Sequence, residues 1–318
     1  MGKFFLSLAL LFQLTAVSGQ TFPAKPLRII VPFPAGGIVD LMARTLNEKL
    51  AAGLGQPVLV EARPGANASL GTEAVAKADP DGHTLVLATL SHVTTPALMK
   101  TPWHPLKDFA GVAVMGHVAN VVVVHPELPS KTLREFVDYA KARPGKLNYI
   151  NAGGGASQTM SAELFKRNAG LDLVGIGYKG FPPANPDILS GQVQFSFMPF
   201  GVAAPHIQSG KLRALAVASP ARSRLFPDVP TMTEAGHAES QVVSWYAYLV
   251  PAATPRTAVA RLNAEFTKAL ADPEVIARIE KIGGEPLPAG KPEEVDAMLG
   301  RELDRWTKLV QATGMKIE

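Results

Sequence analysis

The 318-residue chain contains no cysteine. Thiol nucleophiles, thiolate metal ligands, disulfides and lipid attachment at a cysteine are therefore excluded. Clusters of basic residues are also missing: the formal net charge is only +4, and Lys and Arg alternate with Glu and Asp along the predicted helices. That alternation is typical of solvated helix faces, and it argues against a nucleic-acid-binding protein.

Long apolar runs are missing as well. The N-terminal run from Phe4 to Leu14 follows Lys3 and precedes the small residues 15–19. It is too short to span a bilayer and has the length of a signal-peptide core. We therefore expect a signal peptide at residues 1–19, cleavage before Gln20 and a mature protein in the periplasm.

Motifs for catalysis and cofactor binding are not found either. The seven histidines include no H-x-H or H-E-x-x-H spacing, and the chain has no G-x-S-x-G nucleophile elbow. Residues 175–180 match G-x-G-x-x-G, but the Phe-Pro-Pro that follows leaves no helix to open inside the motif. We expect no metal, no cofactor and no catalytic residue.

The most informative segment that is present covers residues 28–50. It predicts a buried strand (28–31), a Pro/Gly turn (32–37) and an amphipathic helix that begins near Ile38. Free backbone N–H groups and the helix dipole favour an anion at such a junction, and glycine lets a ligand approach the backbone. No Gly-Lys-Ser/Thr follows, so a small carboxylate is favoured over a nucleotide phosphate. The alternative is that Pro and Gly serve only as turn residues.

Two further segments repeat this pattern. Residues 151–157 (NAGGGAS) lead into a helix for which Ser157 is a suitable N-cap, and the Thr159 hydroxyl lies in its first turn. Residues 65–69 (GANAS) also precede a predicted helix. Glycine-rich helix starts far apart in sequence suit a carboxylate held between two lobes.

Strands alternate with helices along the chain, which favours an α/β fold with a parallel or mixed sheet covered on both faces. The chain is long enough for two such lobes. Strands are predicted at 28–31, 57–62, 83–89, 111–117, 121–125, 173–177, 193–199 and 213–219; helices are predicted at 39–52, 71–78, 131–145 and 184–190, and the chain is mainly helical from Pro255.

A series of motifs closely resembles the Bug-type periplasmic solute receptors, the substrate-binding components of tripartite tricarboxylate transporters. The motifs are VPFPAGGIVDLMAR, VEARPGANASLGTEAVAKADPDGHTLVLAT, PGKLNYINAGGGASQTMSAELF, YKGFPPANPDILSGQV, HIQSGKLRALAVASPAR and PDVPTMTEAG. The resemblance runs in order from Pro26 to the C-terminus. It implies a two-lobed type II periplasmic binding protein, a Venus flytrap with a central sheet flanked by helices in each lobe. We expect lobe one at residues 20–123 and 249–318 and lobe two at 124–248, with hinges near Val124 and Leu249.

The resemblance also implies a ligand site. The turns at 33–37 and 153–157 would face each other across the cleft, with Phe33 as a wall and Asp40 as a supporting carboxylate. The residues that it places at the ligand carboxylate are Ala35, Gly36, Gly37, Gly155, Ala156, Ser157 and Thr159. Asn67 and Ser91 would line the pocket from lobe one, and Tyr178 and Lys179 would lie at its rim.

One position departs from the family. Many relatives carry a Phe-Asp pair after Gly-Gln-Val, where the Asp can face a ligand amine, but here Phe197 is followed by Met198. We expect Met198 to lie at the ligand in place of that Asp, and methionine cannot pair with an ammonium group. We therefore expect an organic acid other than an amino acid, with an aromatic, otherwise apolar or dicarboxylic body.

The resulting hypothesis is an extracytoplasmic solute receptor that binds by lobe closure, performs no chemistry and delivers its ligand to a membrane transporter. We expect a monomer, integral-membrane transporter subunits as partners and no nucleic acid. The alternative is an exported α/β enzyme that acts on a carboxylate substrate.

Overall fold

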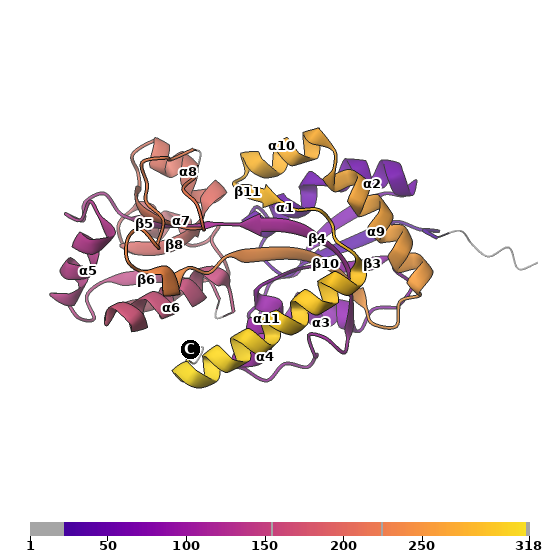
Figure 1. Ribbon diagram of the computed structural model, residues 1–318, viewed down its shortest axis with the longest axis horizontal. Coiled ribbons are helices and arrows are strands. Elements are labelled where there is room, and N and C mark those ends of the chain that lie inside the picture. Colours follow the sequence, from indigo (N-terminus) through magenta and orange to yellow (C-terminus); the bar gives the residue numbers. More distant parts are fainter. Residues whose placement is uncertain (1–21, 154, 224, 316–318) are drawn as a thin grey trace, which may run out of the picture.

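The computed structural model describes residues 22–153, 155–223 and 225–315. Their strands form two sheets, one of six strands and one of five. We call the part built on the six-stranded sheet lobe one and the part built on the five-stranded sheet lobe two; they lie side by side in Figure 1. The predicted signal peptide, residues 1–19, lies outside the described residues.

The sheet of lobe one is mixed, with the strand order β11-β4-β10-β3-β1-β2. β1 pairs in parallel with β2 and β3, whereas β10 is antiparallel to β3 and β4. The strands are β1 (Leu27–Val31), β2 (Val58–Ala62), β3 (Thr84–Thr89), β4 (Phe109–Val118), β10 (Ser244–Pro251) and β11 (Gly284–Pro286). The helices are α1 (Ile38–Thr45), α2 (Asn47–Leu54), α3 (Ser69–Ala76), α4 (Ser91–Leu98), α9 (Arg256–Leu270), α10 (Pro273–Lys281) and α11 (Pro292–Thr313).

The sheet of lobe two has the order β7-β6-β8-β5-β9. β6 is parallel to β7 and β8, and β5 is antiparallel to β8 and β9. The strands are β5 (Asn120–Val124), β6 (Asn148–Asn151), β7 (Val174–Gly177), β8 (Phe195–Pro199) and β9 (Arg213–Ala218). The helices are α5 (Leu133–Lys141), α6 (Ser157–Ala169), α7 (Asn185–Leu189), α8 (Phe200–Gln208) and a short 3₁₀ helix, η1 (Ala238–Ser240).

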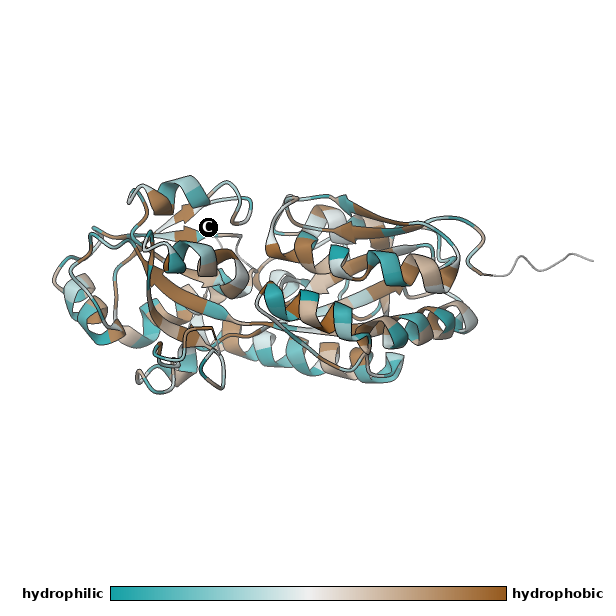
Figure 2. Ribbon diagram, turned by 90° about the horizontal axis from the view of Figure 1, so that it is seen from above, coloured by the Kyte–Doolittle hydropathy of each residue, from teal (hydrophilic) through white to brown (hydrophobic). Residues whose placement is uncertain are grey.

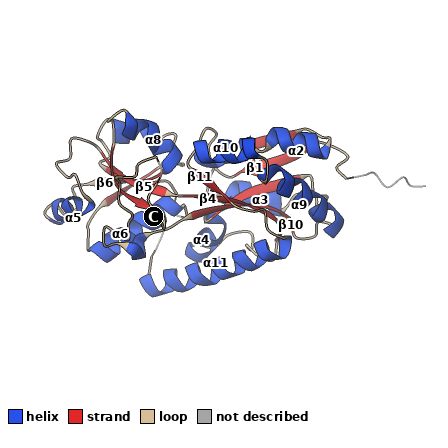
Figure 3. Cartoon of the chain, turned by 45° about the horizontal axis from the view of Figure 1, so that its top comes forward, coloured by secondary structure: helices blue, strands red, loops and turns tan. Residues whose placement is uncertain are grey.

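Both sheets are covered on both faces by helices (Figure 3). The central strands are therefore continuous apolar runs: along β5, Val122 and Val124 pack into one cluster while Val121 and Val123 pack into another. Figure 2 shows the same division, with hydrophobic strands inside and hydrophilic residues along the outer helices. This burial pattern is typical of sheets between two helical layers.

The chain passes from lobe one to lobe two at Ala119, between β4 and β5, and returns between β9 and β10. The expected hinge positions Val124 and Leu249 instead lie inside β5 and β10. Apolarity marks the buried parts of these strands, whereas a change of sheet occurs where a strand ends. The apolar runs therefore could not locate the crossings.

The lobes also touch away from the crossings. Met160 and Leu164 of α6 pack into the lobe-one cluster that contains Trp245 and Trp306. The C-terminal end of α11 reaches α6 as well, where Arg167 Nη1 donates to the Thr313 carbonyl at 2.6 Å (Figure 1). Lobe two is thus held against lobe one by α6.

Most predicted elements are present, with four differences, of which the first is the strand β10, which was not predicted. The single helix expected at 39–52 is divided at Leu46 into α1 and α2. The helices α4 and α8 were not predicted, since each follows a strand directly and contains an internal proline. The short strand β11 interrupts the C-terminal helices.

Candidate functional site

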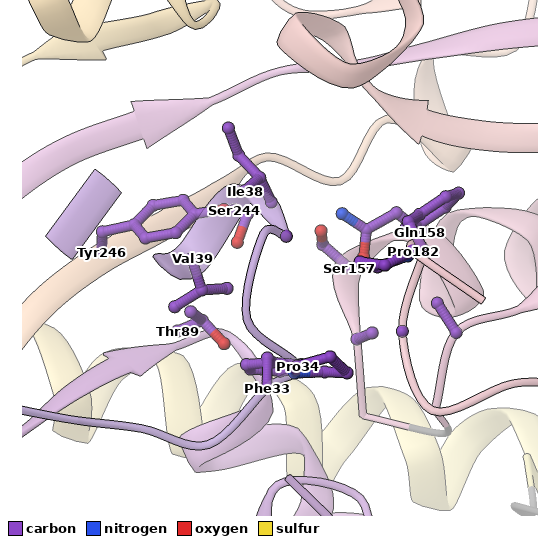
Figure 4. A pocket seen from close by; sticks show the side chains of 15 residues that line it. Phe33, Pro34, Ile38, Val39, Thr89, Ser157, Gln158, Pro182, Ser244 and Tyr246 are labelled. Atoms are coloured by element: carbon purple, nitrogen blue, oxygen red, sulfur yellow. The ribbon is translucent and has the colours of Figure 1, made fainter. Parts of the chain in front are cut away.

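Two helices, one from each lobe, begin at a cavity between the lobes, which we call cavity one. The helix α1 contributes its N-cap Gly37 and its first residues Ile38 and Val39, and α6 contributes its N-cap Ala156 with Ser157 and Gln158. In Figure 4, Ile38 and Val39 lie opposite Ser157 and Gln158. The volume of the cavity is about 40 Å³. Its lining residues are Phe33, Pro34, Gly37, Ile38, Val39, Thr89, Ala152, Ala156, Ser157, Gln158, Gly180, Phe181, Pro182, Ser244 and Tyr246.

Cavity one is suited to an anion although its lining residues are all uncharged. Neither Gly37 nor Ala156 provides a side-chain cap. The first N–H groups of a helix have no partner within the helix, and the helix dipole places partial positive charge there. A carboxylate between α1 and α6 would therefore be held by backbone dipoles from both lobes and not by Lys or Arg.

The first glycine turn is built around Asp40. Its buried carboxylate accepts the Gly36 N–H at 3.0 Å and two N–H groups of Arg44 at 3.0 Å each. The hydrogen bonds that Arg44 donates to Asp40 raise the pKa of Arg44. The Gly37 N–H donates to the Pro34 carbonyl at 3.3 Å.

Two residues of the expected ligand set, Ala35 and Gly36, lie outside both cavity one and the neighbouring cavity described below, and their contact with a ligand stays a prediction. Both residues are exposed, and the Gly36 N–H is already used by Asp40. Gly36 is needed for its conformation, because its φ is +76°. Ile38 and Val39, two and three residues after Gly36, are the first residues of α1, and both line the cavity.

The second glycine turn leads into α6 and is held from within by Thr159. The Thr159 hydroxyl accepts the Ala152 N–H at 3.0 Å and lies 3.2 Å from Asn151 Oδ1, to which it donates. Thr159 lines a separate groove beside α11 and neither of the two cavities. It thus shapes the turn, and its expected contact with the ligand carboxylate stays a prediction.

Gly155 touches lobe one directly. The Thr94 hydroxyl of α4 donates to the Gly155 carbonyl at 2.6 Å. A Cβ atom at Gly155 would lie only 2.3 Å from Thr95 Oγ1 and 3.1 Å from the Thr95 backbone nitrogen. The absence of a side chain at Gly155 allows the two lobes to meet at this point.

A second cavity, which we call cavity two, adjoins cavity one and has a volume of about 180 Å³. The two share Phe33, Pro34, Ala152, Ala156 and Gly180 as a common wall. The expected residues Asn67, Ser91, Gly155, Tyr178 and Lys179 all line cavity two. Of the residues expected to lie at the carboxylate, Gly37, Ala156 and Ser157 line cavity one, together with Phe33.

The backbone of cavity two is unusual at residues 66–68. Ala66, Asn67 and Ala68 have φ angles of +46°, +53° and +70°. Residues other than glycine rarely adopt this left-handed conformation, and such strain clusters at ligand sites. Ser91, from the opposite wall, shares a hydrogen bond of 2.9 Å with the Thr89 hydroxyl of cavity one.

Tyr178 and Lys179 give cavity two its remaining polarity. Burial and a hydrogen bond to Asp187 raise the pKa of Tyr178 to about 12, so its phenol stays neutral. Lys179 is exposed and is the single charged residue among those that line cavity two.

Met198 lies behind the wall of cavity one. It is fully buried in the apolar cluster that also holds Ala152, Ala156 and Phe181, and it lines neither cavity. Its expected direct contact with the ligand stays a prediction, since in this structure Met198 packs behind those wall residues.

Sequence reasoning missed several lining residues, above all Thr89, Gln158, Ser244 and Tyr246. Thr89 ends β3, and ligands of α/β proteins bind beyond the carboxyl ends of parallel strands, so this rule could have found it. Ser244 and Tyr246 share one side of β10, where burial raises the pKa of Tyr246 well above its usual value. Nothing in the local sequence connects β10 with glycine turns so far away in the chain.

Comparison with known proteins gives a consistent result. Residues 42–315 match the model of the tripartite tricarboxylate transporter family receptor. The chain is 37% identical to protein BugT of Bordetella pertussis over 95% of its own length and 93% of that protein.

Two solved structures of similar proteins contain a bound carboxylate. MatC from Rhodopseudomonas palustris, with malate, is 33% identical and has a TM-score of 0.84 over 91% of this chain and all of its own. R. palustris Rpa4515, with adipate, is 29% identical and has a TM-score of 0.88 over 93% of this chain and 99% of its own. The expected resemblance and the two-lobed periplasmic binding protein fold are thereby confirmed.

Proposed function

Because the chain belongs to the tripartite tricarboxylate transporter family of receptors, we propose that it is a solute receptor that binds a small organic carboxylate between its lobes and delivers it to a membrane transporter. The observation that carries this proposal is the pair of uncapped helix N-termini, one from each lobe, that face cavity one. The carboxylates bound by MatC and Rpa4515 support the ligand class.

The sizes of the cavities suggest how the ligand is divided. A buried water needs about 10–15 Å³, so cavity one has room for a carboxylate group and a bridging water but not for a long chain. Cavity two, with about 180 Å³, would hold the body of the acid. A second carboxylate there would meet Lys179 and the hydroxyl of Ser91.

The lining also favours acids without an ammonium group. Among the described residues that line the two cavities none is Asp or Glu, so none of them would neutralise an amine. With an apolar methionine behind the wall at Met198, we propose that amino acids are poor ligands and that aromatic or dicarboxylic acids are preferred.

The proposed setting is the periplasm, after removal of residues 1–19, with the protein acting as a monomer beside integral-membrane transporter subunits. Among the helices of residues 22–315 that the structure describes, none combines the length and apolarity needed to cross a bilayer. We place the lobe boundaries at Ala119 and within residues 219–243, where the chain changes sheet.

We also propose that the protein performs no chemistry on its ligand. Ser157, which follows a glycine-rich turn, is the serine that most resembles a nucleophile. Its hydroxyl oxygen, however, accepts a hydrogen bond from the side-chain amide of Asn120 and is not paired with a base among the described residues. A serine nucleophile needs an adjacent general base. The alternative of an exported carboxylate-processing enzyme therefore has no support at this position.

The test is a ligand screen by calorimetry and thermal shift with the protein from Gln20 onward, using malate, adipate, benzoate and glutamate. At 100 times its Kd, a ligand should stabilise the fold by about 2.7 kcal/mol. Ser157→Ala should weaken binding about 10- to 150-fold, because it removes a hydrogen bond to a charged group worth about 1.5–3 kcal/mol.

Ser209→Ala is the matched control, since that serine bonds only its own turn at the end of α8. It should bind like the unmodified protein. Failure of all four acids to bind would overturn the proposed function, and tight binding of glutamate would overturn the exclusion of amino acids. Turnover of a bound acid would restore the enzyme alternative.

A further inference from the structure

A single buried amide joins the ligand site to both chain crossings. Asn120, the first residue of β5, has no exposed surface. Its Nδ2 donates to Ser157 Oγ at 3.2 Å and to the Val242 carbonyl at 3.4 Å, and its Oδ1 accepts from Gln158 Nε2 at 3.1 Å. Ser157 and Gln158 both line cavity one.

The two ends of this network lie in different parts of the fold. Asn120 follows Ala119, where the chain enters lobe two, and Val242 lies in the segment that returns to β10 of lobe one. The Asn120 amide therefore bridges the outgoing and returning segments and also bonds the first turn of α6. These are the segments whose dihedral angles must change if the lobes move relative to each other.

The donor and acceptor roles in this network are determined by its members. The Val242 carbonyl can only accept, so the NH₂ group of Asn120 must point toward it and the oxygen toward Gln158. The second N–H of the same NH₂ group is donated to Ser157. Because Ser157 Oγ accepts from Asn120, its own proton can be donated into cavity one.

We propose that Asn120 is a positioning residue that orients the Ser157 hydroxyl toward the ligand carboxylate and couples ligand binding to the hinge. The inference rests on the proposed function, since it needs an anion in cavity one. Asn120 itself lies outside the lining of the cavity and acts through Ser157 and Gln158.

The test is a double-mutant cycle with Asn120→Ala and Ser157→Ala, using whichever of malate, adipate, benzoate and glutamate binds the unmodified protein most tightly. Each single variant should raise Kd about tenfold or more, since Ser157→Ala removes a donor to the charged ligand and Asn120→Ala removes the group that orients this donor. The Kd of the double variant should exceed that of Ser157→Ala by at most about twofold, because the effects of residues that act through the same hydrogen bond do not add. If Asn120→Ala does not fold, Asn120→Ser replaces it in the same cycle.

Asn263→Ala is the matched control. Its Nδ2 also donates to two carbonyls, those of Val112 and Gly290 at 2.7 and 2.8 Å, but in α9 and away from both cavities. It should lower the unfolding temperature and leave Kd unchanged. A ligand-induced change in tryptophan fluorescence, which Trp245 and Trp306 at the α6 contact should report, is expected to shrink in the Asn120 variants only.

Two results would overturn this inference but not the proposed function. One is that the Asn120 variants bind with the Kd of the unmodified protein; the other is that the increases in Kd of the two single variants multiply in the double variant. If the unmodified protein binds none of the four acids, the proposed function fails and this inference fails with it. The two failures are thus distinguished by the unmodified protein.

Discussion

Replacing Gly155 by Ala should prevent the lobes from closing fully on a ligand. Gly155 lies in the turn before α6 and meets the first half of α4 from the other lobe. The added Cβ would lie 2.3 Å from Thr95 Oγ1, 2.9 Å from Thr94 Oγ1 and 3.1 Å from the Thr95 backbone nitrogen. Rotating the Thr95 side chain would relieve the first contact at the loss of its hydrogen bond to the Asn67 carbonyl, but it would not move the backbone nitrogen.

The cost follows from where the contact occurs. Overpacking by one methyl group in a tight site costs about 1–3 kcal/mol. Because Gly155 meets α4 only when the lobes are together, this cost is borne by the closed form and not by the separated lobes. The apparent Kd for an acid that binds the closed form should therefore rise roughly 5- to 150-fold.

Calorimetric titration of Gly155→Ala with malate or adipate measures this effect. The matched control is Gly177→Ala, at the end of β7, where an added Cβ would meet no heavy atom within 4 Å. The control should bind like the unmodified protein. If Gly155→Ala binds with unchanged Kd, the contact with α4 is not part of the closed, ligand-bound form, and the reasoning is refuted.

Two further predictions concern titratable groups. Arg44→Met should weaken carboxylate binding about two- to fivefold at low salt, because Asp40 then keeps an uncompensated negative charge at the N-terminus of α1, worth about 0.5–1 kcal/mol. The loss of affinity should shrink as the salt concentration is raised, and Arg44→Lys should largely restore binding. An unchanged Kd in Arg44→Met would contradict this prediction. His92, buried between Trp103 and Phe109, has its pKa lowered to about 4 from an ordinary 6.5. Between these values only the unfolded chain is protonated at this residue, so stability should fall as pH falls from 6.5 to 4, by about 3 kcal/mol in total. Urea unfolding at pH 7 and pH 4.5 should show a smaller drop for His92→Gln, and equal drops would disprove the assignment.

The starts of the two site helices could be predicted from the sequence because the signals are local. A strand, a turn rich in Pro and Gly and an apolar 3.6-residue pattern predict one helix that begins near Ile38 and another with Ser157 as its N-cap. The helix α1 begins at Ile38, whereas α6 begins at Ser157 itself and has Ala156 as its N-cap. The same local signals predicted that these turns would carry the ligand-binding amides. They could not show which amides are available.

Availability depends on hydrogen bonds made within each turn. Gly36 appears as suitable as Ile38 in the sequence, but Asp40, four residues later, takes its N–H. Thr159 has a hydroxyl in the first turn of α6, as predicted, but this hydroxyl faces Ala152 and Asn151. Such partners depend on side-chain direction, which periodicity does not report.

Contacts between segments that are distant in sequence could not be predicted, for a different reason. Tyr246 lies far from both glycine turns in sequence, and it joins cavity one only because β10 is paired between β3 and β4. Met198 was placed at the ligand because of its position after the Gly-Gln-Val motif, yet it is fully buried in an apolar cluster with the wall residues Ala152 and Ala156. Both outcomes are set by strand order, which no single segment encodes.

The opposed helix starts also explain why such a receptor would need its ligand in order to close stably. Each helix N-terminus carries about half a positive elementary charge, so α1 and α6 approach each other with like poles across cavity one. No acidic side chain among the described residues lines cavity one to offset this repulsion.

A bound carboxylate supplies the missing negative charge to both helices at once, so its affinity for the closed form should exceed that for either lobe alone. A ligand shifts an equilibrium only through such a difference in affinity. An uncharged lining would therefore suit a receptor that closes on its ligand, whereas a fixed Asp or Glu in the cavity should favour closed lobes without one.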